Sequence, residues 1–178
     1  IWYPAMDHHY SNPRTVASAL KEWGEVFKAL PRIDAVFVPG GDPGHTRPKV
    51  LFDLLEKQTA NLRKHHPKAE MWMSPQSFTA PWLDEFFTLI RREPAWLAGV
   101  VYGPQTRIPL PKLRASLPAA VMIRDYPDIT HSRQCQYPMP DWDVAFAVTE
   151  CREGCNPRPL QTAQIFRYGR ASTFGFIS

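Results

Sequence analysis

The sequence predicts an α/β fold built on a parallel sheet, of the (β/α)-barrel type and incomplete. Short apolar runs alternate with amphipathic stretches along the 178 residues, the pattern of strands that are each followed by a helix. Three prolines at expected first helical turns, Pro13, Pro48 and Pro81, recur at intervals close to the length of one βαβ unit. A complete eight-stranded barrel usually needs about 250 residues, so this chain is short for one.

Five apolar runs are the expected strands, and a sixth closes the chain. They span residues 1–6, 33–38, 70–73, 97–102 and 121–123, with residues 173–178 as the last. These runs contain Trp2, Asp34 and Trp72, whereas the central strands of an open doubly wound sheet are more uniformly apolar. No glycine-rich phosphate loop follows the first run. We therefore expect a barrel-type sheet, and an open doubly wound sheet is the alternative.

Three helices are expected to begin where a proline follows a cap residue, and a shorter fourth helix fits between Leu110 and Leu117. The three starts are Asn12-Pro13, Thr46-Arg47-Pro48 and Thr79-Ala80-Pro81. Each of these helices carries an apolar stripe at helical spacing, and each stripe needs a sheet to cover it. Trp23 and Trp82, both on helices, are expected in the core. The stripes are Val16, Leu20, Trp23 and Phe27; Leu51, Leu54, Leu55 and Leu62; and Leu83, Phe86, Phe87 and Ile90.

One domain is expected over residues 1–178, because no linker-like stretch divides the chain. The chain opens on Ile1 rather than Met, and its last residues read as a strand with nothing after them. Both ends therefore read as truncated. Because a piece of a barrel leaves strand edges unpaired, we expect self-association or closure by the rest of a parent protein.

Composition limits the classes of partner and cofactor that we expect for this chain. The net charge is +4, but the 21 Lys and Arg residues are scattered along the chain, so a nucleic-acid partner is not expected. No apolar run of about 18 residues is present that could cross a membrane. The three cysteines, Cys135, Cys151 and Cys155, lack the usual spacing of zinc ligands. We therefore expect no metal, no cofactor and no membrane partner.

Polar residues follow the carboxyl ends of the five expected strands. The ends carry Asp7 and His8; Asp42 and His45; Gln76; Tyr102 and Gln105; and Arg124, Asp125 and Tyr126. In parallel α/β folds these ends meet at one edge of the sheet, so they predict one shared pocket. Hydrogen-bonding side chains beside flat aromatic rings, such as that of Trp142, match the hydroxyls and the apolar face of a sugar. The sequence therefore predicts a carbohydrate ligand.

The stretch Val38-Pro39-Gly40-Gly41-Asp42 resembles the glycine-glycine-aspartate at a strand end of β-N-acetylhexosaminidases of the family 20 and family 84 glycosidase type. The resemblance implies a (β/α) barrel in which one carboxylate orients the substrate's acetamido group for attack on its own anomeric carbon. The next carboxyl of the family acts as general acid, whereas Pro43 stands at that position here. A glycosidase of this type would favour a secreted or periplasmic location, which the sequence by itself leaves open.

We therefore expect hydrolysis of a glycosidic bond, with an N-acetylhexosamine-type sugar as one candidate substrate. The candidate catalytic residues are Asp42, Asp7 and Asp125, as acid, base or substrate-orienting groups. The expected substrate-binding residues are His8, His45, Gln76, Tyr102, Gln105, Arg124, Tyr126 and Trp142. The sugar, its linkage and the general acid stay open.

Two other functions fit the same strand ends. One is a non-catalytic sugar-binding barrel. The other is a metal-dependent amidohydrolase of barrel type, whose ligands would come from His8, His9, His45 and His131. Adjacent residues of a strand point to opposite faces, so at most one of His8 and His9 would face inward. The glycosidase is therefore favoured over the amidohydrolase.

Overall fold

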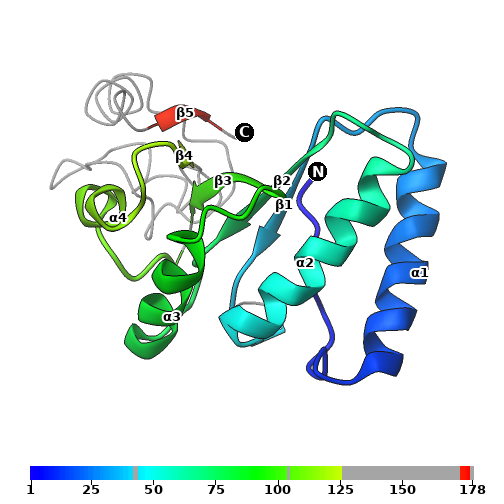
Figure 1. The fold of residues 1–178 in the computed structure, drawn as a ribbon, viewed down its shortest axis with the longest axis horizontal. Helices are drawn as coiled ribbons and strands as arrows, with labels where there is room; N and C mark the ends of the chain where they lie inside the picture. Colours follow the sequence, from blue (N-terminus) through cyan, green and yellow to red (C-terminus); the bar gives the residue numbers. More distant parts are fainter. Residues whose placement is uncertain (42–43, 104, 126–172, 177–178) are drawn as a thin grey trace, which may run out of the picture.

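The computed structural model describes residues 1–41, 44–103, 105–125 and 173–176, with Asp125 and the last four residues described by their backbone alone. These residues form a parallel sheet covered by helices (Figure 1). The strands are β1 (Ala35–Pro39), β2 (Glu70–Ser74), β3 (Leu97–Tyr102), β4 (Met122–Asp125) and β5 (Thr173–Phe176). They pair in the order β1-β2-β3-β4-β5, and each of these pairs is parallel. The predicted α/β class and parallel pairing are confirmed.

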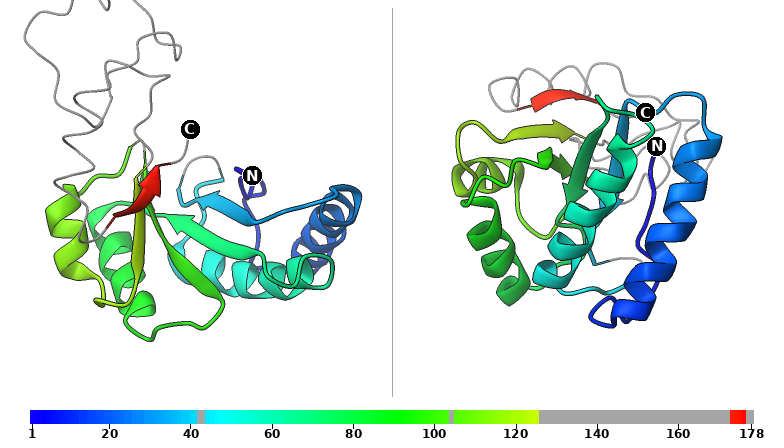
Figure 2. Two further views of the ribbon diagram at one scale, coloured as in Figure 1. Left: turned by 90° about the horizontal axis from the view of Figure 1, so that it is seen from above. Right: turned by 45° about the vertical axis from the view of Figure 1, so that its right-hand side comes forward.

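The helices lie on one face of the sheet (Figure 2). α1 (Pro13–Ala29) precedes β1, and α2 (Pro48–Arg63), α3 (Ala80–Ile90) and α4 (Leu110–Ser116) each connect one strand to the next. Every connection between β1 and β4 steps to the next strand in the same direction. Because such crossovers are right-handed, they place successive helices on the same side.

The expected prolines all fall in the first turns of helices, but only one expected side-chain cap is present. At α1, the Asn12 side chain accepts a hydrogen bond of 2.9 Å from the backbone N–H of Arg14. At α2 the cap position falls on Arg47, and at α3 Thr79 makes no cap hydrogen bond. Proline fixes φ in the first turn, so it marks a helix start even without a capping side chain. The prolines are Pro13, Pro48 and Pro81.

The expected first strand is reduced to a single parallel bridge between Trp2 and Phe37. The backbone N–H of Phe37 donates to the Ile1 carbonyl at 2.8 Å, and the N–H of Tyr3 donates to the Phe37 carbonyl at 2.9 Å. The next bond of this ladder would run from the N–H of residue 39 to the Tyr3 carbonyl, but Pro39 has no N–H to donate, so the ladder does not continue. The prediction of a strand over residues 1–6 was therefore too long. The segment still extends the sheet beyond β1.

The main core lies between the sheet and the helices. Alternate strand residues point toward the helices and are fully buried: Val36, Val38, Met71, Met73, Val100 and Ile123. The predicted helical stripes supply the other side of this core, although Val16 and Leu20 are only half-buried. The aromatic rings of Trp23 and Phe27 meet edge to face with centroids 6.1 Å apart. The alternating apolar residues of the strands and the apolar stripes of the helices thus pack against each other in one core layer.

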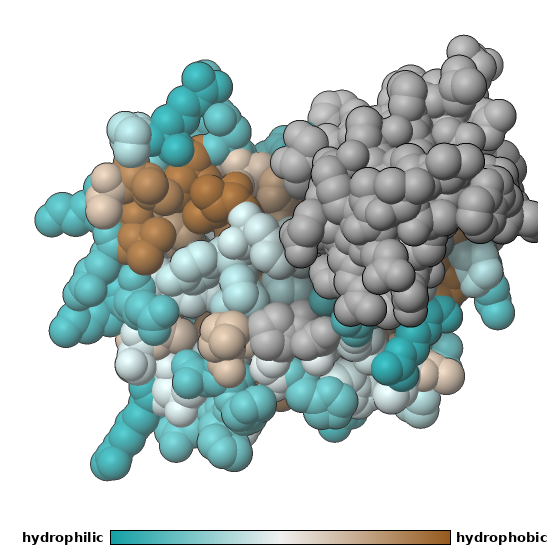
Figure 3. All heavy atoms as spheres, turned by 180° about the vertical axis from the view of Figure 1, so that it is seen from behind, coloured by the Kyte–Doolittle hydropathy of each residue, from teal (hydrophilic) through white to brown (hydrophobic). Residues whose placement is uncertain are grey.

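The opposite face of the sheet carries a smaller buried cluster of Ala35, Phe37, Trp72 and Val101. The Arg124 guanidinium lies over the Trp72 ring, 4.5 Å from its centroid, and 5.5 Å from the centroid of Phe37. The Glu70 carboxylate accepts a hydrogen bond of 2.8 Å from the Trp72 indole. A view from behind shows apolar side chains gathered on one side of the molecule (Figure 3). Cation–π stacking therefore ties β4 to β1 and β2 on this face.

A buried polar contact joins α1 to α2. The Asn61 side-chain amide donates to the Leu20 carbonyl at 2.7 Å, and that of Gln58 donates to the Ala19 carbonyl at 3.0 Å. A Cβ at Gly24 would lie 3.1 Å from the Asn61 amide nitrogen, so the missing side chain gives this amide room against α1. The two helices are therefore held by side-chain to backbone hydrogen bonds as well as by apolar packing.

We expect Asn61→Ala to lower the free energy of unfolding by about 1–2 kcal/mol, because both the donor and its buried packing volume are lost. Urea denaturation followed by circular dichroism measures the effect. The exposed residue Glu56, on the same helix, supplies the control, and Glu56→Ala should change stability by less than about 0.5 kcal/mol. Equal stabilities of the two variants would contradict a stabilising role for this contact.

Candidate functional site

The carboxyl ends of the described strands lie at one edge of the sheet. Pro39 at the end of β1 is in register with Ser74 at the end of β2, and Tyr102 of β3 pairs with Asp125 of β4. The loops that follow these strands therefore emerge together, as parallel pairing requires. The predicted meeting of strand ends at one edge holds for these four strands.

An open pocket of about 450 Å³, the edge pocket, lies among the loops after β1, β2 and β3. The lining groups are backbone atoms, two hydroxyls, an amide, an imidazole and a guanidinium. Among the described lining residues there is no carboxylate. The lining can therefore donate and accept hydrogen bonds, with one fixed positive charge. The described lining residues are Gly41, Gly44, His45, Ser77, Thr79, Gln105 and Arg107.

Hydrogen bonds fasten the three loops to one another. The backbone N–H of Gly41 donates to the Gln76 carbonyl at 2.7 Å, which joins the first loop to the second. The N–H of Ser77 donates to the Gln105 carbonyl at 3.0 Å, and the Ser77 hydroxyl donates to the Gln105 side-chain oxygen. The second loop is thus joined to the third twice. The pocket is held in shape by the chain itself.

Three residues of the edge pocket have left-handed backbones that non-glycine residues rarely adopt. The φ angles are 46° at His45, 57° at Ser77 and 56° at Gln105. Elsewhere in the described part of the chain, Glu93 is the one other non-glycine residue with positive φ. Such conformations cost about 1–3 kcal/mol each and cluster at functional sites. Their gathering here sets this pocket apart from the ordinary turns of the fold.

The glycines of the motif are required by close packing within the chain. A Cβ at Gly40 would lie 2.5 Å from the Ser74 carbonyl oxygen and 2.7 Å from the Phe78 ring. A Cβ at Gly41 would lie 3.1 Å from the carbonyl oxygen of Gln76. Gly40 therefore makes room for Ser74 and Phe78, and the space beside it is filled by this chain and not open to a ligand.

An aromatic ring stands beside the edge pocket. The ring centroids of His45 and Trp82 are 4.8 Å apart with the planes inclined by 43°. Trp82 is half-buried and meets Phe78 edge to face at 5.8 Å. The expectation that Trp82 is a core residue is thus met only in part, since its ring also supports the exposed His45. Stacking restricts where the imidazole can lie.

Asp7 and His8 are not among the described residues that line the edge pocket. Asp7 is exposed, and its backbone N–H donates to the Tyr10 hydroxyl at 3.1 Å. Burial raises the pKa of Tyr10 to about 12, so this hydroxyl stays protonated. The His8 Nδ1 lies 3.1 Å from the Gly44 carbonyl oxygen, which ties the N-terminal segment to the loop after β1.

The other predicted site residues divide into three groups. His45 and Gln105 line the pocket, and Gln76 is buried next to it through its bond to Gly41. Tyr102 packs partly against the helix-side core, while Arg124 stacks on Phe37 and Trp72 on the other face. Asp42, Tyr126 and Trp142 lie outside the described residues, and Asp125 is placed by its backbone only. Substrate contacts by all of these residues stay predictions.

Five described lining residues were not among the predicted site residues: Gly41, Gly44, Ser77, Thr79 and Arg107. Thr79 was interpreted only as a helix cap. Arg107 is the second residue after Gln105, so a signal was available in the loop that follows β3. A loop that turns back over the strand end brings its later residues to the pocket as well. The prediction considered only a few polar residues directly after each strand, so it missed Thr79 and Arg107, which each lie five residues after a strand end.

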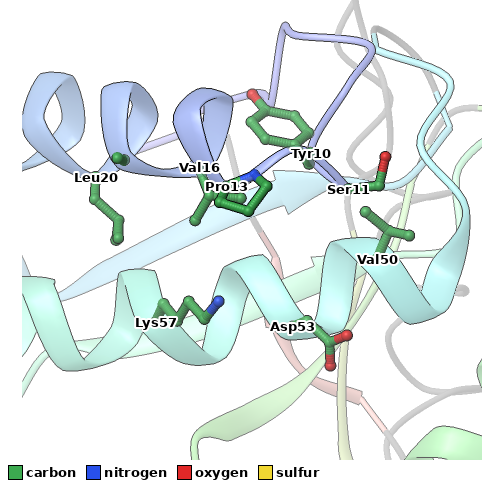
Figure 4. A pocket seen from close by; sticks show the side chains of 9 residues that line it. Tyr10, Ser11, Pro13, Val16, Leu20, Val50, Asp53 and Lys57 are labelled. Carbon is green, nitrogen blue, oxygen red and sulfur yellow. The ribbon is translucent and has the colours of Figure 1, made fainter.

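A second pocket, of about 540 Å³, lies between α1 and α2 (Figure 4). Val16 and Leu20 of α1 lie across it from Val50 of α2. Its acidic residue, Asp53, is already paired with Lys49 at 2.5 Å. This groove therefore offers mainly the apolar sides of two helices, and its carboxylate is engaged elsewhere.

The described part of the chain contains no group of three or more His, Cys, Asp or Glu side chains placed to hold a metal ion. No helix described here has the length and apolar character needed to cross a membrane. Comparison with protein-family models, curated proteins and solved structures finds no match for this chain.

Proposed function

We propose that the sheet is part of a (β/α) barrel. Two features support this. Consecutive strands are neighbours in sequence order, and the helices cover one face only, as they do when a sheet curls around an axis. In a doubly wound sheet the strand order reverses and helices cover both faces. The N-terminal bridge from Trp2 to Phe37 adds to the sheet on the side of β1, in the place of a first barrel strand.

We also propose that the protein is a carbohydrate-active hydrolase that cleaves a glycosidic bond at the edge pocket. The observation that carries the proposal is the gathering of left-handed His45, Ser77 and Gln105 around one pocket at the carboxyl edge of a parallel sheet. The lining hydroxyls, amide and imidazole match the hydrogen-bonding groups of a sugar. Because hydrogen bonds hold these strained backbone conformations in place, the lining groups are preorganised for a ligand.

The proposed catalytic groups are the three carboxylates that the sequence predicts, Asp42, Asp7 and Asp125. Asp42 lies in the chain between Gly41 and Gly44, which both line the pocket. Its proposed role is to orient or polarise the substrate, with Asp7 and Asp125 as candidates for a second acid or base. Gln105 and His45 are the proposed sugar contacts. An N-acetylhexosamine-type sugar is the first substrate to test.

Non-catalytic sugar binding is the second candidate. It is favoured by one observation, the lack of a carboxylate among the described lining residues. The two candidates share the ligand class and differ in turnover. Binding of an oligosaccharide without release of reducing sugar would favour this candidate over the hydrolase.

The decisive experiment is a panel of 4-nitrophenyl glycosides that includes the N-acetyl-β-glucosaminide. We expect release of nitrophenol from at least one glycoside, and Gln105→Ala should weaken it because the amide that binds the sugar is lost. The control is Arg63→Ala, since Arg63 is exposed in the last turn of α2, which leads to the opposite edge of the sheet. This variant should keep the parent's rate. Neither hydrolysis nor binding of any sugar in the panel would contradict the proposal.

A further inference from the structure

Arg107 is the one formally charged side chain among the described residues that line the edge pocket. It is exposed, and no carboxylate of the described residues forms an ion pair with it. Arg47, by comparison, is paired with Glu85 at 2.9 Å. Arginine presents a planar fork of donors that fits a carboxylate or sulfate group better than a neutral hydroxyl.

The same pocket receives the N-terminal end of α3. Thr79 lines the pocket and stands at the cap position of this helix, yet its side chain makes no cap hydrogen bond. The first turn of α3 contains no acidic residue. The unsatisfied backbone N–H groups of a helix start carry partial positive charge, which adds to the charge of Arg107.

We propose that the edge pocket takes an acidic saccharide, whose carboxylate or sulfate group binds Arg107. The inference rests on the proposed sugar site and narrows its substrate class. The neutral hydroxyls and amides of Ser77 and Gln105 contact the ring, and the guanidinium contacts its charged substituent. Neutral sugars of the same stereochemistry bind the same pocket less tightly because they leave the guanidinium without an anion.

The test compares sugars that differ by one charged group. Affinities are measured by isothermal titration calorimetry for 4-nitrophenyl N-acetyl-β-glucosaminide and its 6-sulfate, and for 4-nitrophenyl β-glucoside and β-glucuronide. In the unmodified protein the acidic member of at least one pair should bind about tenfold tighter at low salt, and the preference should shrink as salt screens the charges. The sulfate pair and the carboxylate pair separate the two sources of negative charge.

Arg107→Gln is the matching variant, with Arg92→Gln, at an exposed position just after α3, as control. Because Arg107 is exposed, its replacement should leave folding intact. It should remove the preference for the acidic sugar while the neutral sugar keeps its affinity, and Arg92→Gln should change neither. If neutral and acidic sugars bind equally in the unmodified protein, the inference is wrong and the sugar site stands. If no sugar binds, the proposed function itself fails.

Discussion

Asp42→Asn is expected to lower turnover of a hydrolysed glycoside by about 10²–10⁴-fold while the protein stays folded. Asparagine keeps the shape of the side chain but cannot accept a proton or carry the negative charge that orients a substrate group. The cap position of α2 is Arg47, so the change does not remove the cap of that helix. Initial rates with the best glycoside of the panel, together with a thermal melt, measure both expectations.

The control for this variant is Asp53→Asn, since Asp53 is paired with Lys49 on the surface of α2. It should keep full turnover, and the loss of one exposed ion pair should lower stability by no more than about 1 kcal/mol. Full activity of Asp42→Asn would remove Asp42 from the mechanism and make Asp7 or Asp125 the next carboxylate to replace. A large loss of stability with unchanged activity per folded molecule would assign Asp42 a structural role.

Local patterns predicted the helices and most strands because the forces that set them act within a few residues. Pro13 and Pro48 fix the first turns of α1 and α2, and each apolar stripe has the period of a helix that lies on a sheet. The first expected strand was predicted too long because the effect of Pro39 on its partner was overlooked. Pro39 has no N–H to donate to the Tyr3 carbonyl, so the ladder stops there, and this limit was visible in the sequence.

A strand boundary explains the place of Arg124. The apolar run that predicted β4 ends at residue 123, so Arg124 was interpreted as a loop residue at the edge of the pocket. The strand continues to Asp125, and within a strand Arg124 must lie on the face that carries Trp72. A difference of two residues at one boundary thus decides which face of the sheet a side chain occupies. Arg124 stacks on the chain's own rings there, and its contact with a substrate stays a prediction.

The edge pocket could be located from the sequence, but its lining could not be completed. His45 and Gln105 were found because parallel strand ends meet at one edge. The left-handed backbone of Ser77 depends on its bonds to Gln105, a residue far along the chain, and no local pattern encodes it. The packing of Phe78 against Gly40 is equally non-local. Long-range contacts therefore decide which loop residues face a ligand.

Gly44→Ala is expected to lower the free energy of unfolding by about 2–4 kcal/mol, the sum of two separate costs. The first is conformational, because φ at Gly44 is 99°, where an L-residue with a side chain is strained. The second is steric, because a Cβ there would overlap the Ala5 carbonyl oxygen. That oxygen belongs to the backbone, so it cannot move aside by a change of rotamer.

The same replacement at Gly24 is the control, since Gly24 lies inside α1 and its nearest obstacle is the Asn61 side chain at 3.1 Å. A helix gains about 1 kcal/mol from alanine in place of glycine, which offsets the tighter contact, so Gly24→Ala should stay within about 1 kcal/mol of the parent. Urea denaturation of the three proteins gives the comparison. Because the loop at Gly44 also accepts the His8 contact, Gly44→Ala should release the N-terminal segment, seen as faster amide exchange at Tyr3. Unchanged stability and exchange would show that this segment is not held against the loop after β1.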